Sequence, residues 1–325
     1  MTKAIRLHET GGPEVLRWED FELGDPGPGQ VRMRNTAVGI NYRDIYIRKG
    51  MHPLASMPSG IGIESAGVIE ALGSGVSGLN IGQRVACVAG PEGAYAEARL
   101  VPAARVVPLP EGIDERSAAS MMIRGMTACY LLRQTYAVRS GDAILIHAAA
   151  GGVGLLVCQW AKHLGATVIG TVGSRDKADL ARAHGCDHAI VYTEEDFAER
   201  VRAITGGAGV AVAYDSVGKT TFEGSLRCLR RRGVLASFGE SSGDPEPVAP
   251  KRLGPLGSVY ITHPSLPDYT ATREELLDTA NQLFAMVLAG KLRVNINQEY
   301  ALKDAAQAHR DLEARRTTGA SVLIP

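Results

Sequence analysis

The chain has 325 residues, more than a domain with a single hydrophobic core usually contains, and this length predicts about two domains. Its 35 Lys and Arg residues balance 35 Asp and Glu residues, so net charge argues against nucleic acid or an anionic membrane as a partner and favours small molecules. The N-terminal residues offer no signal-peptide core and no apolar run approaches the length of a membrane span, so we expect a cytoplasmic protein.

The first 125 residues contain short β-like segments such as KAIRL, QVRMR and QRVACV, separated by Gly- and Pro-rich turns. This pattern predicts a β-rich domain. From residue 126 to about 264 the pattern changes to apolar strand segments that alternate with helical stripes: AILIHA, TVIGTV, AIVY, VAVAYDSV and GVLASFG, with helices expected near 176–184 and 220–231. Such alternation is typical of an α/β fold with a doubly wound parallel sheet.

After the strand-like SVYIT, the region 265–325 carries a long amphipathic helix at about 272–290, a second helix and a terminal ASVLI segment. We expect this tail to rejoin the first domain. The predicted division is therefore 1–125, 126–264 and 265–325.

The cysteines and histidines give no metal-binding or disulfide pattern. The five cysteines are far apart and form no C-x-x-C pair, and Cys158 lies among apolar neighbours, so we expect them in the core. The lone histidines also lack a partner at ligand spacing and are interpreted as structural: His8, His147, His163 and His309.

The segment AAGGVG, residues 149–154, fits the phosphate-binding pattern G-x-G-x-x-G with Ala149 in the first position. Gly151 would let the backbone approach a pyrophosphate, and Gly154 would let the following helix pack closely on the strand. A Gly-rich helix entry without a ligand is the alternative. The strand before the loop and the amphipathic helix after it favour a dinucleotide bound at the helix N-terminus.

The tip of the next strand indicates which dinucleotide binds. NAD-specific folds end this strand in an acid that bonds the ribose 2′-hydroxyl, whereas here TVIGTV runs into Gly173, Ser174, Arg175, Asp176 and Lys177. A hydroxyl and two cations at this place favour the 2′-phosphate of NADPH. The alternative is that Arg175 and Lys177 are ordinary solvated charges.

Motifs along nearly the whole chain resemble the medium-chain dehydrogenase/reductase superfamily, specifically its bacterial NADPH:quinone oxidoreductases related to zeta-crystallin. The resemblance is carried by GGPEVL, AVGINYRDIYIRKG, PSGIGIESAG, GAYAE, HAAAGGVGLLVCQWAKHLGA, YDSVG, SFGESSG, THPSL and TGASVLIP. It implies a GroES-like first domain, a Rossmann second domain and a cofactor in the cleft between them. It also implies a homodimer that pairs its sheets through SVYIT.

The resemblance separates this chain from the zinc-dependent branch of the superfamily. That branch has a metal-binding Cys and a G-H-E motif where this chain has Asn41 and Ile63, although Glu64 remains. The Cys-rich structural-zinc lobe is also missing. We therefore expect no metal.

The resemblance also implies roles for individual residues. Tyr46 resembles a side chain of the substrate pocket, although a role in packing alone is the alternative. Asn41, Tyr46 and His52 are the candidates to stabilise negative charge on a substrate carbonyl. The residues expected to bind the cofactor are Asn41, Arg43, Asp44, Thr127, Gly151, Gly152, Val153, Gly173, Ser174, Arg175, Lys177, Tyr192, Ser216, Phe238, Gly239, Glu240 and Arg315.

Four residues depart from the pattern of the family that the chain resembles: Arg43 replaces an apolar residue, His52 a Tyr, Glu240 an Asn and His263 an Arg. Arg43 could add positive potential for phosphates or an anionic substrate, and His52 could supply a proton. Either side chain could instead face solvent.

The implied activity is reduction of quinones by NADPH without zinc. A 2-alkenal or enone reductase shares every motif and is the second enzyme hypothesis. A protein of another class, binding NADPH structurally as a crystallin or binding RNA with little turnover, is the third. The neutral charge and 5% aromatic content argue against an RNA surface.

Overall fold

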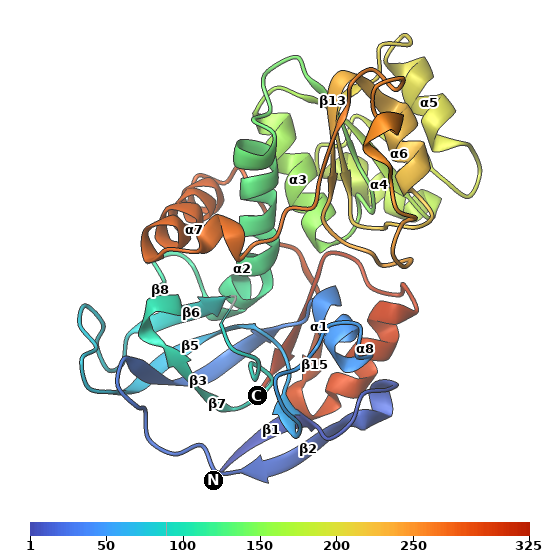
Figure 1. Cartoon of the computed structure of the whole chain (residues 1–325). Helices are drawn as coiled ribbons and strands as arrows, with labels where there is room; N and C mark the ends of the chain where they lie inside the picture. Colours follow the sequence, from blue (N-terminus) through green and yellow to red (C-terminus); the bar gives the residue numbers. More distant parts are fainter. Residues whose placement is uncertain (89) are drawn as a thin grey trace. The chain divides into compact units, whose positions relative to one another are not determined.

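The structure is a computed structural model that describes residues 1–88 and 90–325 (Figure 1). The chain divides into two compact units. The first comprises Met1–Met126, Thr270–Leu288 and Val294–Pro325, and the second comprises Thr127–Tyr269 and Ala289–Arg293. The division falls inside helix α2 (Glu115–Tyr130).

The second unit is built on a six-stranded sheet in the order β11-β10-β9-β12-β13-β14, with every neighbouring pair parallel. The strands are β9 (Ala143–Ile146), β10 (Thr167–Val172), β11 (His188–Val191), β12 (Val210–Asp215), β13 (Leu229–Ser237) and β14 (Tyr260–Thr262). The order reverses between β9 and β12, which is where open parallel sheets bind ligands. The predicted doubly wound fold is confirmed.

Both faces of this sheet are covered, as the fully apolar strands predict. Successive residues of a strand point to opposite faces, and Ile144, Leu145 and Ile146 are all buried. The covering helices are α3 (Gly152–His163), α4 (Arg175–Ala183), α5 (Phe197–Ile204) and α6 (Phe222–Cys228). Helices α5 and α6 share one hydrophobic cluster with the sheet through residues such as Val201, Phe222 and Leu226.

One predicted boundary in this unit is wrong. The helix expected over 220–231 ends at Cys228, and strand β13 starts at Leu229. Residues 230–232 are three exposed arginines, which have good helix propensity, but β13 pairs with β12 from Leu229 onward through a register shift. Arg232 adopts a φ of 58°, so tertiary pairing overrides the local preference here.

The first unit contains a β-rich sheet in the order β15-β16-β3-β5-β6-β8, with β7 also paired to β3. A smaller sheet has the order β2-β1-β4. The strands are β1 (Thr2–Leu7), β2 (Leu16–Phe21), β3 (Gln30–Gly39), β4 (Ser59–Gly60), β5 (Glu64–Leu72), β6 (Arg84–Val88), β7 (Ala98–Pro102), β8 (Val106–Pro108), β15 (Ile296–Ala301) and β16 (Ala320–Ile324).

The C-terminal residues complete this sheet. Val322 and Leu323 of β16 pair antiparallel with Gly39 and Val38 of β3, so the two ends of the chain share one core. Helices α1 (Tyr42–Arg48), α7 (Arg273–Leu288) and α8 (Ala305–Glu313) belong to the same unit. Figure 1 shows α1 and α8 side by side, and Ile47 and Ala308 lie in a common hydrophobic cluster.

The five cysteines are buried as free thiols, which confirms their expected place in the core. Among the described residues, no helix is long and apolar enough to cross a membrane.

Helix α3 approaches the end of β9 closely in the second unit. A Cβ atom on Gly154 would lie 2.3 Å from the Ala148 carbonyl oxygen and 2.7 Å from the Ala149 Cα atom. Both are backbone atoms, which cannot rotate away as a flexible side chain could. Only glycine therefore fits at this position without moving the helix.

We predict that Gly154→Ala lowers the free energy of unfolding by about 2 kcal/mol or more, because the added methyl group must displace α3 from the loop. Urea unfolding measures this. Gly254→Ala is the matched control in the same unit: its Cβ would meet nothing closer than 3.9 Å, so a change within about 0.5 kcal/mol is expected. Equal stability of the two variants would contradict the steric argument.

Candidate functional site

The loop between β9 and α3 presents backbone N–H groups at a helix N-terminus. Ala148 adopts a φ of 51°, and the Gly151 N–H group donates to the Ala148 carbonyl at 2.8 Å, which closes a tight turn. Gly151 is the extended N-cap of α3, and no described side chain caps the helix there. The first-turn N–H groups of Gly152 and Val153 thus offer the geometry and the positive dipole end that an anionic phosphate requires.

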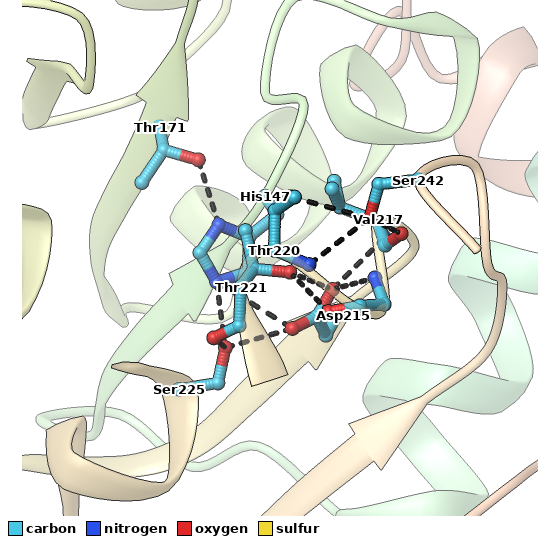
Figure 2. A network of polar contacts seen from close by, with 9 residues as sticks. His147, Thr171, Asp215, Val217, Thr220, Thr221, Ser225 and Ser242 are labelled. Atoms are coloured by element: carbon cyan, nitrogen blue, oxygen red, sulfur yellow. Dashed lines mark hydrogen bonds and ion pairs between the residues drawn. The ribbon is translucent and has the colours of Figure 1, made fainter. Parts of the chain in front are cut away.

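A buried polar network lies beside this loop at the carboxyl ends of the sheet strands (Figure 2). The Asp215 Oδ1 atom accepts bonds from the N–H groups of Val217 and Gly218 and from the Thr221 hydroxyl, at 2.8 to 3.1 Å. The Asp215 Oδ2 atom accepts a bond from the Ser225 hydroxyl at 2.8 Å. The hydrogen-bonding capacity of the fully buried Asp215 side chain is thereby satisfied within the protein.

His147 connects this network to the next strand. Because the Ser225 hydroxyl donates to Asp215, the Ser225 oxygen accepts from His147 Nε2–H at 2.8 Å. The Nδ1 atom then accepts from the Thr171 hydroxyl, also at 2.8 Å. Burial lowers the pKa of His147, and the nearby Asp215 charge opposes this effect only in part. The ring is neutral and structural, which agrees with the sequence interpretation of this histidine.

The tip of β10 gathers the residues predicted to select NADPH. Ser174 is the N-cap of α4, and its hydroxyl accepts from the Lys177 N–H group at 3.4 Å. A Cβ on Gly173 would lie 2.9 Å from the Tyr192 hydroxyl, so glycine makes room for that ring. Gly173 and Tyr192 are therefore neighbours, and so are Ser174 and the backbone of Lys177.

Arg175 has a partner that the sequence did not reveal. Its guanidinium group donates to both carboxylate oxygens of Glu194, at 3.0 and 3.1 Å, while its side chain is 81% exposed. An exposed pair of this kind contributes little free energy, so a 2′-phosphate could replace Glu194 at low cost.

Four further candidates lie together where β12 and β13 end. A Cβ on Gly239 would lie 3.1 Å from the Ser216 carbonyl oxygen, and the Phe238 N–H group donates to the Asp215 carbonyl at 2.8 Å. Glu240 packs beside Gly218, since a Cβ there would lie 3.1 Å from the Glu240 Cα atom. Thr127 is buried in α2 of the same unit.

In the first unit, Asn41 is held by a buried carboxylate. Its Nδ2 atom donates to Glu64 Oε2 at 2.7 Å, and the Ile123 N–H group donates to Glu64 Oε1 at 2.7 Å. Burial raises the pKa of Glu64, while the Arg124 guanidinium group, 4.0 Å away, lowers it. One Asn41 N–H group is thus committed to Glu64, and the Asn41 side-chain oxygen accepts from the Asp44 backbone in the capping box of α1, which leaves the second amide N–H group for a ligand.

A second buried carboxylate, that of Asp44, lies in the first turn of α1. The Asp44 Oδ2 atom accepts from the Asn41 N–H group at 2.8 Å and from the Tyr95 hydroxyl at 2.9 Å. The Tyr95 oxygen lies 3.1 Å from His309 Nε2, and His309 Nδ1 lies 3.3 Å from Arg48 Nη1. Because Arg48 can only donate, His309 accepts at Nδ1 and donates from Nε2 to Tyr95.

Burial is the main cause of the pKa shifts of Asp44 and His309 in this hydrogen-bonded series. Burial raises the pKa of Asp44 to about 7, although the bonds from Asn41 and Tyr95 oppose the shift. Burial and then the Arg48 charge lower the pKa of His309 to about 3, so the ring is neutral at physiological pH. Sequence reasoning missed Tyr95 and Arg48 because their partner His309 lies 214 and 261 residues away in the chain.

The remaining candidates of the first unit have the following neighbours. The ring centroids of Tyr46 and His52 lie 5.2 Å apart, and Tyr46 is only 8% exposed. Arg43 forms an ion pair with Glu92 at 2.5 Å, so its charge is already balanced by a carboxylate. Arg315 follows α8 with a φ of 57° and belongs to this unit, whereas Gly173, Lys177 and Tyr192 belong to the other.

The residues in the zinc positions do not fit a metal. Asn41 presents an amide already bonded to Glu64, and Ile63 presents a hydrocarbon, so neither supplies the thiolate or imidazole that zinc binds. In the described part of the chain, no group of three or more His, Cys, Asp or Glu side chains could hold a metal ion.

The pKa of Asp44 predicts a measurable pH dependence. A carboxyl whose folded-state pKa lies near 7 holds a proton that the unfolded chain has lost above pH 4, so its contribution to stability is lost as pH rises from about 4 to about 7. The neutral isostere in Asp44→Asn should therefore gain stability relative to the parent over that interval, by up to about 4 kcal/mol.

Urea unfolding at several pH values between 4 and 8 tests this expectation. Asp179→Asn is the control, because the Asp179 side chain is 77% exposed and its curve should stay parallel to that of the parent. Parallel curves for Asp44→Asn and the parent would show that the Asp44 carboxyl ionises as in water.

Comparison with known proteins identifies families and relatives that match both units of the chain. Residues 152–282 match the family described as zinc-binding dehydrogenase, and residues 27–111 match the alcohol dehydrogenase GroES-like domain. The chain is 50% identical to the quinone oxidoreductase of Pseudomonas aeruginosa and 46% identical to the 2-haloacrylate reductase of a Burkholderia species. The matches cover 100% of this chain and 100% and 99% of the two relatives.

A solved structure of Escherichia coli quinone oxidoreductase complexed with NADPH is 46% identical and superposes with a TM-score of 0.97, covering 99% of this chain and 100% of that one. These matches span both units and agree with the Rossmann and GroES-like architecture expected from the sequence. The chain belongs to the quinone oxidoreductase family of the medium-chain dehydrogenase/reductase superfamily.

Proposed function

We propose that this chain is an NADPH-dependent quinone oxidoreductase that works without zinc. The observation that carries the proposal is the strand tip of β10, where Gly173 and Ser174 take the place of the acid that binds the ribose 2′-hydroxyl in NAD-specific folds. The relatives named above include an enzyme of this activity at 50% identity and a homologue bound to NADPH.

The second unit would hold the phosphates of the dinucleotide. The first turn of α3 would bind the pyrophosphate through the N–H groups of Gly152 and Val153. Ser174, Arg175 and Lys177 would bind the 2′-phosphate, with Arg175 leaving Glu194 as it does so. When bound, NADPH supplies a hydride to the substrate.

The first unit would supply polar groups for the substrate carbonyl. As the hydride arrives, negative charge grows on the carbonyl oxygen and must be met by donors. Asn41 can offer its second N–H group, oriented by Glu64, and the neighbouring rings of Tyr46 and His52 can offer a hydroxyl and a ring N–H. We assign these three residues to carbonyl stabilisation.

The activity is tested by following NADPH oxidation at 340 nm with and without 1,4-benzoquinone. The parent should turn over with quinone and should prefer NADPH to NADH by at least about tenfold in kcat/KM, the effect of about 1.4 kcal/mol. Tight NADPH binding without turnover on quinones or enones would support a structural or RNA-binding protein instead.

The double variant Arg175→Ala with Lys177→Ala should raise the KM for NADPH by about tenfold or more and leave NADH kinetics unchanged, since only the 2′-phosphate loses contacts. Arg182→Ala is the matched control on the same helix, because Arg182 pairs with Asp179 on the exposed side. An equal effect on both cofactors would remove these residues from phosphate selection.

The carbonyl-stabilising residues have their own test. Tyr46→Phe together with His52→Ala should lower kcat by about tenfold to a hundredfold, the usual effect of losing a hydrogen-bond donor to a developing oxyanion. The dissociation constant for NADPH serves as the control and should stay near the parent value. Unchanged turnover of every accepted substrate would mean that neither side chain acts on the carbonyl.

A second enzyme hypothesis is favoured by one relative, the 2-haloacrylate reductase at 46% identity. A 2-haloacrylate has a carbon–carbon double bond conjugated to a carboxylate, as an enone has one conjugated to a carbonyl, so the same donors would meet the substrate oxygens. Assaying 2-chloroacrylate and a 2-alkenal beside the quinone decides between the two readings by kcat/KM.

We also propose a homodimer in the cytoplasm. Strand β14 is the edge of the six-stranded sheet, and Tyr260 within it is 59% exposed, as suits an edge that pairs with a second copy. Sedimentation measures the mass of the assembly.

The five free thiols support the proposed cytoplasmic location, because free thiols persist in a reducing compartment.

A further inference from the structure

Two of the five cysteines contact each other in the second unit. Cys158 lies in α3, and Cys186 lies in the connection between α4 and β11. Their thiols are joined by a hydrogen bond, and the side chains are 0% and 4% exposed. The mechanism proposed above uses neither thiol.

The backbone around the pair is also close. Gly185, with a φ of 93°, precedes Cys186, and a Cβ on Gly185 would lie 3.1 Å from the Cys158 carbonyl oxygen. The chain at residues 185–186 therefore passes directly against the turn of α3 that carries Cys158. Adjacent backbones and contacting sulfurs are what a disulfide requires, since its Cα atoms lie about 5 to 6 Å apart.

The pair lies next to the phosphate loop. A Cβ on Gly170 of β10 would lie 2.9 Å from the Cys186 sulfur and 2.6 Å from the Ala149 Cβ atom. A bond between the two cysteines would thus tie α3, whose first turn is the proposed phosphate site, to the segment that precedes β11.

We propose that Cys158 and Cys186 form a modification site, a dithiol that hydrogen peroxide oxidises to a disulfide. The Cys186 thiolate attacks one peroxide oxygen, which breaks the O–O bond, forms a sulfenic acid and releases hydroxide. The Cys158 thiol then attacks the Cys186 sulfur, the S–O bond breaks and water leaves. Counting the proton released by Cys186, two thiols are oxidised and one peroxide is reduced to two waters.

The order of attack follows from the environments of the two sulfurs. The hydrogen bond from Cys158 lowers the pKa of Cys186 and raises that of Cys158, so Cys186 is the thiol of the two that ionises more readily. Cys186 also lies in an irregular connection, which opens more easily than the helix that holds Cys158. Burial raises the pKa of Cys228 to about 12, which makes that thiol a poor nucleophile and a suitable control.

The test uses the purified full chain and hydrogen peroxide. After treatment, removal of peroxide with catalase and denaturation, the thiols are counted and the peptides are mapped by mass spectrometry. Two of the five thiols should be lost, a peptide linked through Cys158 and Cys186 should appear, and dithiothreitol should restore the count. Retention of all five thiols, or loss confined to other cysteines, would overturn the proposal.

Variants separate the two roles and need no assumption about enzyme activity. Cys158→Ser removes the resolving thiol, so peroxide should leave a dimedone-reactive sulfenic acid on Cys186 and no disulfide; Cys158→Ala serves as a second form of the same deletion. Cys228→Ser should lose two of its four thiols as the parent loses two of five. Dimedone labelling that avoids Cys186 in both Cys158 variants, or a Cys228 variant that forms no linked peptide, would contradict the assignment.

Discussion

Helix α3 approaches the end of strand β9 so closely that residue 154 has room only for a hydrogen atom, and the candidate site of the second unit depends on this contact. The contact fixes where the first turn of α3 points its N–H groups, and the turn at Ala148 adopts a left-handed conformation to reach it. Beneath the turn, His147 and Asp215 exchange hydrogen bonds through Ser225 without any exposed member. The loop is therefore held rigidly from both sides, so the loop loses less conformational entropy when a phosphate binds.

In the first unit, the candidate polar groups lie at the start of a short helix, α1. Two buried carboxylates position Asn41: Glu64 fixes the Asn41 side chain, and Asp44 fixes the Asn41 backbone. Each carries a raised pKa, so each stores a desolvation cost that its hydrogen bonds only partly offset. The C-terminal segment contributes His309 to this arrangement and β16 to the sheet, which explains why the first unit needs residues from both ends of the chain.

The sequence predicted the parts of this protein that follow from local pattern. Apolar runs and helical stripes predict the strands of the parallel sheet, and AAGGVG predicts the turn into α3, because sterics and hydrogen bonding within a few residues determine both. The boundary at Leu229 could not be predicted, since Arg230 favours a helix locally and is recruited into β13 only by pairing with β12. The interaction partners of Tyr95, Arg175 and Cys186 could not be predicted from the sequence either. Each joins segments that only the folded chain brings together, and no pattern in the sequence marks Glu194 rather than Glu195 as the carboxylate that Arg175 meets.

The central claim is that the first turn of α3 and the tip of β10 bind NADPH. Hydrogen exchange followed by mass spectrometry tests it most directly, because bound phosphate oxygens would accept bonds from the backbone N–H groups that otherwise exchange with water. Saturating NADPH should slow exchange in peptides covering 148–158 and 173–178, and NADH at equal concentration should protect the second region less. Unchanged exchange in both regions, with NADPH bound to the protein, would contradict the account.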